Sequence, residues 1–283
     1  MSPHSEHVDA STLTLIPPRE ELWNVDGWQR YSAERESGPN IALATRKSYE
    51  AFSESERFRY DLQRKFLASN LPKIETPMAV PVRNQIGVIV SRNAFNHDPG
   101  PREGIFLSAN PGLGKSTLVR EIAADFDQDI RGLAQMMPSK FGRNDRWIPV
   151  VWISVPSKVS IISLCRRILY FFGYEMRNGA RQAELEQQVL TLIRDCGVQL
   201  IVFDDITRLN MNRDPDKDVA DWIRHLMEAS VTIIGIGVDI ETSGLAQAPD
   251  RVATEARAAL KQNRTRFSMH ALARFTYDTD AEI

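Results

Sequence analysis

Short apolar stretches and longer amphipathic stretches alternate through most of the chain. Near-continuous apolar runs are typical of strands buried on both faces of a parallel sheet, and apolar residues spaced by three or four are typical of helices. The alternation therefore predicts an α/β fold in which helices cover both faces of a five-stranded parallel sheet, with right-handed crossovers. The predicted strands are centred near residues 105, 151, 201, 234 and 268.

The predicted helices follow the strands in turn, after one that leads into the first strand. They cover residues 80–95, a stretch that starts at Lys115, and residues 160–174, 181–195, 218–229 and 251–262. One connection, residues 131–147, is long, and long loops in compact domains are often functional. This stretch is a candidate DNA-binding segment because of its basic residues, which are Arg131, Lys140, Arg143 and Arg146.

The N-terminal part is expected to differ from the rest. Residues 1–43 have few periodic apolar positions and several proline and glycine breakers, which is typical of a flexible arm. Residues 44–98 are predicted to form a helical extension, with a solvated surface helix or helix pair at 45–69. Residues 99–283 are predicted to form the nucleotide-binding domain.

The predicted arm contains four large apolar side chains. Either they dock on a partner or they pack on the surface of the folded domain, and the second alternative is favoured. These residues are Leu22, Trp23, Trp28 and Tyr31.

Composition indicates an ordinary globular protein, since 42% of the 283 residues are apolar and 25% are charged. The formal net charge is −2, so nucleic-acid binding would have to come from a local basic patch. The chain has neither a signal-peptide pattern at its start nor an apolar run long enough for a membrane span. Cys165 and Cys196 lie in helical patterns without metal-type spacing, so we expect reduced core thiols in a cytoplasmic protein.

The candidate chemistry centres on the first strand and the glycine-rich turn that follows it. Gly112 and Gly114 permit backbone dihedrals closed to other residues, so that main-chain N–H groups can approach phosphate oxygens. The helix that starts at Lys115 directs its free N–H groups at the same anion, and Lys115 is placed to meet the β- and γ-phosphates of ATP. Ser116 is the expected Mg²⁺ ligand, and Thr117 is the next donor. The nucleotide-binding set is Ala109, Asn110, Pro111, Gly112, Leu113, Gly114, Lys115, Ser116 and Thr117, with Ala109 where the strict motif has glycine.

A second motif is an apolar strand that ends in two carboxylates, Asp204 and Asp205. Parallel strands bring their carboxyl ends to one edge of the sheet, where the phosphate loop also lies. Asp204 is expected to hold Mg²⁺, mostly through water, and Asp205 to orient or deprotonate the attacking water. The alternative is that these carboxylates are helix caps or surface charges.

The fourth predicted strand has glycine at 235 and 237, which would allow close approach of backbone or ligand. Asp239 at its end either senses the γ-phosphate or caps the following turn, and both alternatives stand. Because the carboxylate-bearing strand is the third, the strand order fits a P-loop NTPase of the AAA+ (ASCE) type better than an adenylate kinase or a small GTPase.

Taken together, these motifs resemble the TniB/TnsC group of AAA+ ATPases that act in DNA transposition. The resemblance covers roughly residues 45–280 and rests on the stretches 109–117, 149–156, 200–206 and 235–239, followed by Arg266 and Phe267. It implies an ATPase that uses ATP and Mg²⁺, with Lys115, Ser116, Asp204 and Asp205 in the roles given above. It also implies an ATP-bound oligomer or filament that assembles on double-stranded target DNA, recruits a transposase and a target-selection protein, and disassembles on hydrolysis.

Three departures from the family pattern matter. Asp205 stands where most such ATPases have glutamate, and its shorter side chain predicts slow turnover. Val238 stands where the family tends to have threonine, so the sensor role would pass to Asp239. The chain also ends where the small helical lid domain would begin, so the C-terminal lid is expected to be absent from this sequence, either because the sequence stops short of it or because the protein lacks this half of the nucleotide clamp.

The resemblance further implies an arginine that reaches the γ-phosphate bound by the next subunit, and such arginine fingers contribute on the order of 10³–10⁵ in rate. Arg264 and Arg266 are the best-placed candidates, and the alternative is that they form surface salt bridges. Head-to-tail contacts of this kind close into rings or continue as helical filaments, depending on the rotation between subunits.

Two other functions stay open. One is a signalling or scaffold NTPase switch that acts through protein partners, with the aromatic residues of the arm as its effector. The other is a relative that binds ATP with little hydrolysis. A protein partner other than a transposase, with DNA-insensitive hydrolysis, would favour the first, and binding without turnover would favour the second.

Overall fold

The computed structural model describes residues 22–34, 43–69, 76–137, 146–174, 179–209, 213–243, 245 and 266–273. The chain divides into two compact units, one made of residues 1–20 and 33–74 and the other of residues 21–32 and 75–283. The domain boundaries at residues 43 and 98 stay predictions, although residues 21–32 belong to the same unit as the nucleotide-binding part.

The larger unit is built on a parallel sheet of five strands, in the order β2-β3-β4-β1-β5. The predicted α/β fold and its five strands are confirmed. Four of the strands are almost wholly buried, as their continuous apolar runs predicted. The strands are β1 (Gly104–Ser108), β2 (Val150–Ser154), β3 (Leu200–Asp204), β4 (Thr232–Gly237) and β5 (Phe267–Ala271).

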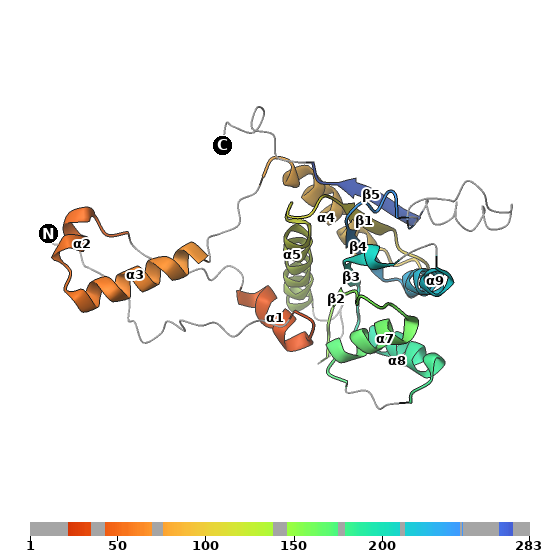
Figure 1. Ribbon diagram of the computed structural model, residues 1–283. Helices are drawn as coiled ribbons and strands as arrows, with labels where there is room; N and C mark the ends of the chain where they lie inside the picture. Colours follow the sequence, from red (N-terminus) through yellow and green to blue (C-terminus); the bar gives the residue numbers. More distant parts are fainter. Residues whose placement is uncertain are drawn as a thin grey trace. The chain divides into compact units, whose positions relative to one another are not determined.

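Helices cover both faces of this sheet (Figure 1). Two of them, α4 (Ala79–Phe95) and α5 (Lys115–Met136), lie together on one side. On the other side lie α7 (Ile161–Phe171), α8 (Gln182–Asp195) and α9 (Asp214–Glu228).

The predicted loop at 131–147 is wrong at its start. The helix α5 continues to Met136, so Arg131 is helical. Ile130 is buried on the apolar face of α5, and Leu133 follows it at helical spacing, so burial continues the helix past the glycine at 132. Lys140 and Arg143 of this segment lie outside the described residues, as does the predicted helix at 251–262.

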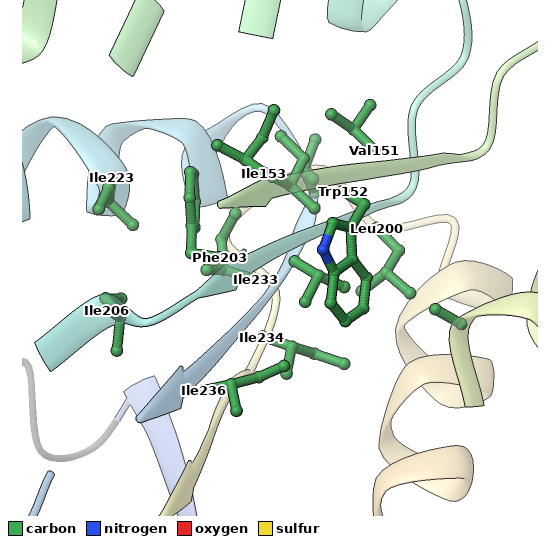
Figure 2. Packing of buried hydrophobic residues seen from close by; sticks show 14 of the residues in the cluster. Val151, Trp152, Ile153, Leu200, Phe203, Ile206, Ile223, Ile233, Ile234 and Ile236 are labelled. Carbon is green, nitrogen blue, oxygen red and sulfur yellow. The ribbon is translucent and has the colours of Figure 1, made fainter. Parts of the chain in front are cut away.

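The core between the sheet and its helices is made largely of β-branched and aromatic side chains (Figure 2). Side chains from the three strands β2, β3 and β4 pack in layers, because neighbouring parallel strands hold their residues in register. The buried residues labelled in Figure 2 are Val151, Trp152, Ile153, Leu200, Phe203, Ile206, Ile223, Ile233, Ile234 and Ile236.

A tryptophan of the expected arm is part of this core. It lies on helix α1 (Val25–Glu34), and its side chain is 0% exposed. The Trp28 ring stacks on Trp152 of β2, with 6.1 Å between ring centroids, and its Nε1 donates a hydrogen bond to Asp127 Oδ2 at 3.2 Å. We call Trp28, Asp127, Arg131 and Trp152 the Trp28 anchor. The structure thus confirms that Trp28 packs on the folded domain, and the side chain lies in the core and not on the surface.

The smaller unit contains a helix pair, as predicted, made of α2 (Arg46–Ala51) and α3 (Glu54–Ser69). Tyr49 joins the two helices, because its hydroxyl donates to Asp61 Oδ2 at 2.8 Å. The guanidinium of Arg57 lies 5.7 Å from the centre of the Tyr49 ring. This basic side chain therefore contacts a residue of its own helix pair, which agrees with the prediction that the pair is a solvated surface element.

Candidate functional site

The phosphate loop connects the end of β1 to the start of α5. Gly112 and Gly114 have φ values of 81° and 77°, in the left-handed region where a side chain is strained. A Cβ atom at either position would meet nothing within 4 Å. The glycines are therefore required by backbone conformation and not by crowding, and the space beside the loop is open.

The start of α5 presents its free main-chain N–H groups to this loop. Its N-cap is Gly114, which has no side chain to satisfy them, so they remain available to an anion. Lys115 Nζ donates to the carbonyl oxygens of Ala109 at 2.8 Å and Asn110 at 3.0 Å. These bonds hold a positive charge over the loop, where phosphate oxygens could replace the carbonyl oxygens.

Ser116 and Asp204 join the two predicted motifs. The Ser116 hydroxyl donates to Asp204 Oδ1 at 2.8 Å, although the residues are 88 positions apart in the chain. The same oxygen accepts a bond from the main-chain N–H of Asp205 at 3.1 Å. A hydroxyl and a carboxylate oxygen are ligands that Mg²⁺ prefers, and here they are in direct contact.

The Asp204 carboxyl has a raised pKa. Burial is the largest cause, and the charge of Asp205 adds to it, while the hydrogen bond from Ser116 opposes it. The surroundings of Asp204 therefore disfavour its ionised form. A cation bound there would restore the ionised form.

Asp205 lies at the end of β3 with φ 62° and ψ 41°, a left-handed conformation that aspartate tolerates better than most residues. Its side chain is 58% exposed and forms an ion pair with Arg208, whose Nη2 lies 2.9 Å from Asp205 Oδ2. Arg208 Nη1 also donates to the carbonyl oxygen of Val155 at 2.8 Å. Arg208 is not among the residues that the sequence motifs predict, although its spacing of three residues from Asp205 is a signal that could have indicated it.

The two glycines of β4 allow close approach, as predicted, but of side chains within the fold. A Cβ at Gly235 would lie 2.7 Å from a ring atom of Phe106, and one at Gly237 would lie 2.6 Å from the methyl group of Thr207. The main-chain N–H of Ala109 donates to the carbonyl oxygen of Gly237 at 3.3 Å. The end of β4 is thereby tied to the start of the phosphate loop.

Asp239 begins a turn just beyond β4. Its φ is 50°, and its carbonyl oxygen accepts bonds from the N–H of Thr242 at 3.1 Å and from the Thr242 hydroxyl at 3.0 Å. This geometry favours the turn alternative, and the sensor role of its carboxylate stays a prediction. A carboxylate that the sequence analysis missed, that of Glu241, accepts a bond from the Ser108 hydroxyl at 2.6 Å at the end of β1.

Arg266 lies where the strands of the sheet begin, whereas the phosphate loop of its own chain lies where they end. It precedes Phe267, which pairs with Gly104 at the start of β1, so about 13 Å of strand separates it from the loop. It forms an ion pair with Glu228 at 3.7 Å. Burial lowers the pKa of the neighbouring Arg224 to about 10, and the charge of Arg266 contributes. Arg266 is therefore distant from the phosphate loop of its own chain, and Arg264 lies outside the described residues.

The residues present fit a nucleoside triphosphate with Mg²⁺. The loop is open, its helix end offers free N–H groups, one ammonium lies over it, and a hydroxyl and a carboxylate meet beside it. Within the described ranges, no group of three or more His, Cys, Asp or Glu side chains is arranged to hold a metal ion by itself. This is consistent with Mg²⁺, which is usually held by few protein ligands together with phosphate oxygens.

In the described part of the chain, none of the helices has the length and apolar character that a bilayer crossing would need.

Comparison with known proteins gives one family and a set of similar folds. A family model described as "Bacterial TniB protein" matches residues 92–277. No curated protein matches the chain. The Orc1 protein of Aeropyrum pernix, solved in complex with DNA, is 12% identical, with a TM-score of 0.51 over 75% of this chain and 51% of that chain. Cdc6p from Pyrobaculum aerophilum is 16% identical, with a TM-score of 0.46 over 74% of this chain and 48% of that chain.

The chain thus spans about half the length of both solved structures. At such low identities a structural likeness shows the fold alone, and the first of these structures shows that the fold is of the AAA+ type.

Proposed function

The chain belongs to the bacterial TniB family, and we propose from this that it binds and hydrolyses ATP with Mg²⁺, assembles on double-stranded DNA and recruits or activates a transposase. The observation on which the proposal depends is the 2.8 Å bond between Ser116 and Asp204. It brings the phosphate loop and the carboxylate strand to one point, as a Mg²⁺-dependent nucleotide site requires.

The proposed roles follow from the contacts at this point. ATP and Mg²⁺, when bound, supply the phosphoryl group and the positive charge that neutralises it in the transition state. Lys115 would exchange its bonds to the carbonyls of Ala109 and Asn110 for bonds to phosphate oxygens. Ser116 and Asp204 would hold the metal, and Asp205 would orient the attacking water or accept its proton.

We also propose that the active form is an oligomer, either a ring or a filament on DNA. The ion pair of Arg266 with Glu228 is exposed enough to be exchanged, because the arginine side chain is 32% exposed and the glutamate 53%. Arg266, or Arg264, would then reach the γ-phosphate bound by the next subunit. Asp239 is retained as a candidate sensor at the end of β4.

The proposed DNA contact has to be local, since the net charge of the chain is −2. The ion pair of Arg131 with Asp127, at 2.9 Å, weakens the case for the segment 131–147 as a DNA contact. The solved complex of the Aeropyrum pernix protein with DNA supports DNA as a candidate partner for this chain.

DNA binding can be measured with duplex DNA over a series of salt concentrations, with ATP, with ADP and without nucleotide. We expect the protein to bind DNA when ATP is present. The logarithm of the association constant should fall linearly with the logarithm of the salt concentration, because phosphate contacts release counterions. The variant Lys115→Ala should lose the ATP-dependent part. If ATP gives no DNA binding at any salt concentration, the DNA part of the proposal is wrong.

The transposase can be tested separately. An integrase-type transposase encoded beside this gene would be purified and mixed with the protein, DNA and ATP. We expect a complex that forms with ATP and dissociates on hydrolysis, and no complex with Lys115→Ala. If ATP-dependent DNA binding occurs and the complex does not form, the recruiting role is contradicted while the ATPase role stands.

A second candidate, an ATP-binding relative with little hydrolysis, is favoured by one observation. The carboxylate of Asp205, the proposed catalytic base, is in an ion pair with Arg208. The signalling alternative has less support, because Trp28 of its proposed effector surface is buried in the core.

A further inference from the structure

Arg208 is attached to two parts of the sheet edge at once. One nitrogen of its guanidinium donates to the Asp205 carboxylate at 2.9 Å, and another donates to the main-chain carbonyl of Val155 at 2.8 Å. Val155 follows β2, and Asp205 follows β3. The guanidinium therefore ties the exit of one strand to the carboxylate at the exit of its neighbour.

The backbone around Arg208 is well anchored. It ends a short 3₁₀ turn, η2 (Ile206–Arg208), in which Ile206 is 2% exposed, and the following Leu209 is 1% exposed. The N–H of Arg208 donates to the carbonyl of Asp205 at 3.1 Å. Because Ile206 and Leu209 are buried on either side of it, the start of the Arg208 side chain is held in place, and its charged end is directed at Asp205.

This ion pair occupies one of the two carboxylate oxygens with which Asp205 could orient a water. A carboxylate that orients a water for attack must present an oxygen to that water, within hydrogen-bonding distance. Asp205 Oδ2 instead accepts from Arg208 Nη2 at 2.9 Å. The shorter side chain of aspartate leaves little reach to satisfy both partners.

We propose that Arg208 is a restraining residue, which holds Asp205 away from its catalytic orientation and keeps basal ATP hydrolysis low. This inference rests on the proposed ATPase function. The restraint is weak enough to be released, since both side chains are well exposed, at 44% and 58%. Release would require the bond to Asp205 to break, and the bond to Val155 gives Arg208 a partner to keep when it does.

The test measures ATP hydrolysis without DNA for the full chain and for Arg208→Ala, at saturating Mg²⁺ and ATP. We expect kcat to rise about two- to five-fold in Arg208→Ala, the size appropriate to an exposed ion pair, with an unchanged nucleotide dissociation constant. Arg208→Lys should be intermediate, since lysine keeps the charge but has no fork to hold both partners. Arg194→Ala, which removes an exposed arginine from α8, is the matched control and should leave kcat unchanged.

Two further measurements separate restraint from a structural role. In an Asp205→Asn background, Arg208→Ala should give no rise, because the effect acts through that carboxylate. Salt screens exposed ion pairs, so the ratio of the two rates should approach one as the salt concentration rises. A merely structural role of Arg208 predicts neither result.

A kcat that falls or does not change in a folded Arg208→Ala protein overturns the inference. If that variant does not fold, Arg208→Lys decides by the same criterion. If the parent and the variant both bind ATP and neither hydrolyses it, restraint is not what limits turnover, and the inference is again overturned. If the parent does not bind ATP, as measured by calorimetry, the proposed function itself fails instead.

Discussion

Asp204 at the phosphate loop and Asp127 in the Trp28 anchor are two carboxyls with the same perturbation and different surroundings. Burial raises the pKa of both. Asp127 is 1% exposed and accepts bonds from Trp28 Nε1 at 3.2 Å and from Arg131 Nε at 2.9 Å. Asp204 accepts from the hydroxyl of Ser116 and the main-chain N–H of Asp205.

The difference lies in the charge of the donors. Asp127 is hydrogen-bonded to the guanidinium of Arg131, so a positive charge of its own chain balances the charge of its carboxylate. The hydrogen-bond donors at Asp204 are neutral. Its neighbour Asp205 raises the pKa of Asp204, and the charge of Arg120 lowers that pKa by less, so a cation from solution would stabilise the ionised form. A raised pKa alone therefore does not distinguish these two carboxyls, and the charge of their hydrogen-bond donors does.

The largest expected effect is on the Trp28 anchor. Trp28→Ala should lower the free energy of unfolding by about 3–5 kcal/mol, because it removes a fully buried ring that stacks on Trp152. Urea denaturation followed by circular dichroism would measure it. Nucleotide affinity of the folded variant should be unchanged, and a loss below about 1 kcal/mol would contradict the burial.

At the phosphate loop we expect the opposite, a loss of activity and nucleotide affinity with little change in stability. Lys115→Ala should reduce kcat by about 10²–10³-fold, with a large loss of ATP affinity, because it removes the positive charge over the loop. The unfolding midpoint without nucleotide should hardly change. Lys158→Ala, which alters an exposed lysine after β2, serves as the control. Equal turnover in the parent and Lys115→Ala would remove the loop from the mechanism.

A smaller effect is expected from Arg131→Ala, which leaves Asp127 buried without its cation. We expect a loss of about 1–3 kcal/mol in the free energy of unfolding at neutral pH. The loss should shrink as the pH falls, because the neutral carboxyl no longer needs the guanidinium. Chemical denaturation at pH 7.5 and pH 5, against Arg194→Ala, tests this, and a loss independent of pH would mean that packing on Trp147 dominates.

The smallest expected effect is a change in the pKa of one of the two carboxyls when Mg²⁺ and ATP bind. Because the folded-state pKa of both is raised above the unfolded value, each contributes more stability to the metal-free protein as the pH falls through the folded value. Mg²⁺ with ATP should compete with the proton at Asp204 and lower its pKa, and it should leave Asp127 unaffected.

Carbon-13 NMR of the aspartate carboxyls, with and without Mg²⁺ and ATP, would follow both titrations. The affinity for Mg²⁺ and ATP should fall a few-fold between pH 7.5 and pH 5, and Asp204→Asn should reduce this dependence to the part that comes from protonation of the ATP phosphate. Equal shifts at Asp127 and Asp204 on addition of Mg²⁺ would contradict the proposed metal site.

Much of the site could be predicted from local pattern. Gly112 and Gly114 were expected because a left-handed turn needs glycine, and both have that conformation. Asp204 was expected beside the phosphate loop because parallel strands share a carboxyl edge, and Ser116 contacts it. The bond of Arg208 to Asp205 follows from a spacing of three residues, but its second bond, to the carbonyl of Val155, could not be predicted because that residue is 53 positions away.

The arm is the clearest case in which local pattern was not enough. Trp28 lies among breakers and shows little periodicity, and its partners Asp127 and Trp152 are far along the chain. The order of apolar and polar residues was sufficient for the strands, the helices and the phosphate loop, because those depend on neighbours within a few positions. Which buried carboxyl is hydrogen-bonded to a guanidinium and which accepts only from neutral donors was decided only by the tertiary structure, since charge compensation depends on distances between residues that the chain order does not contain.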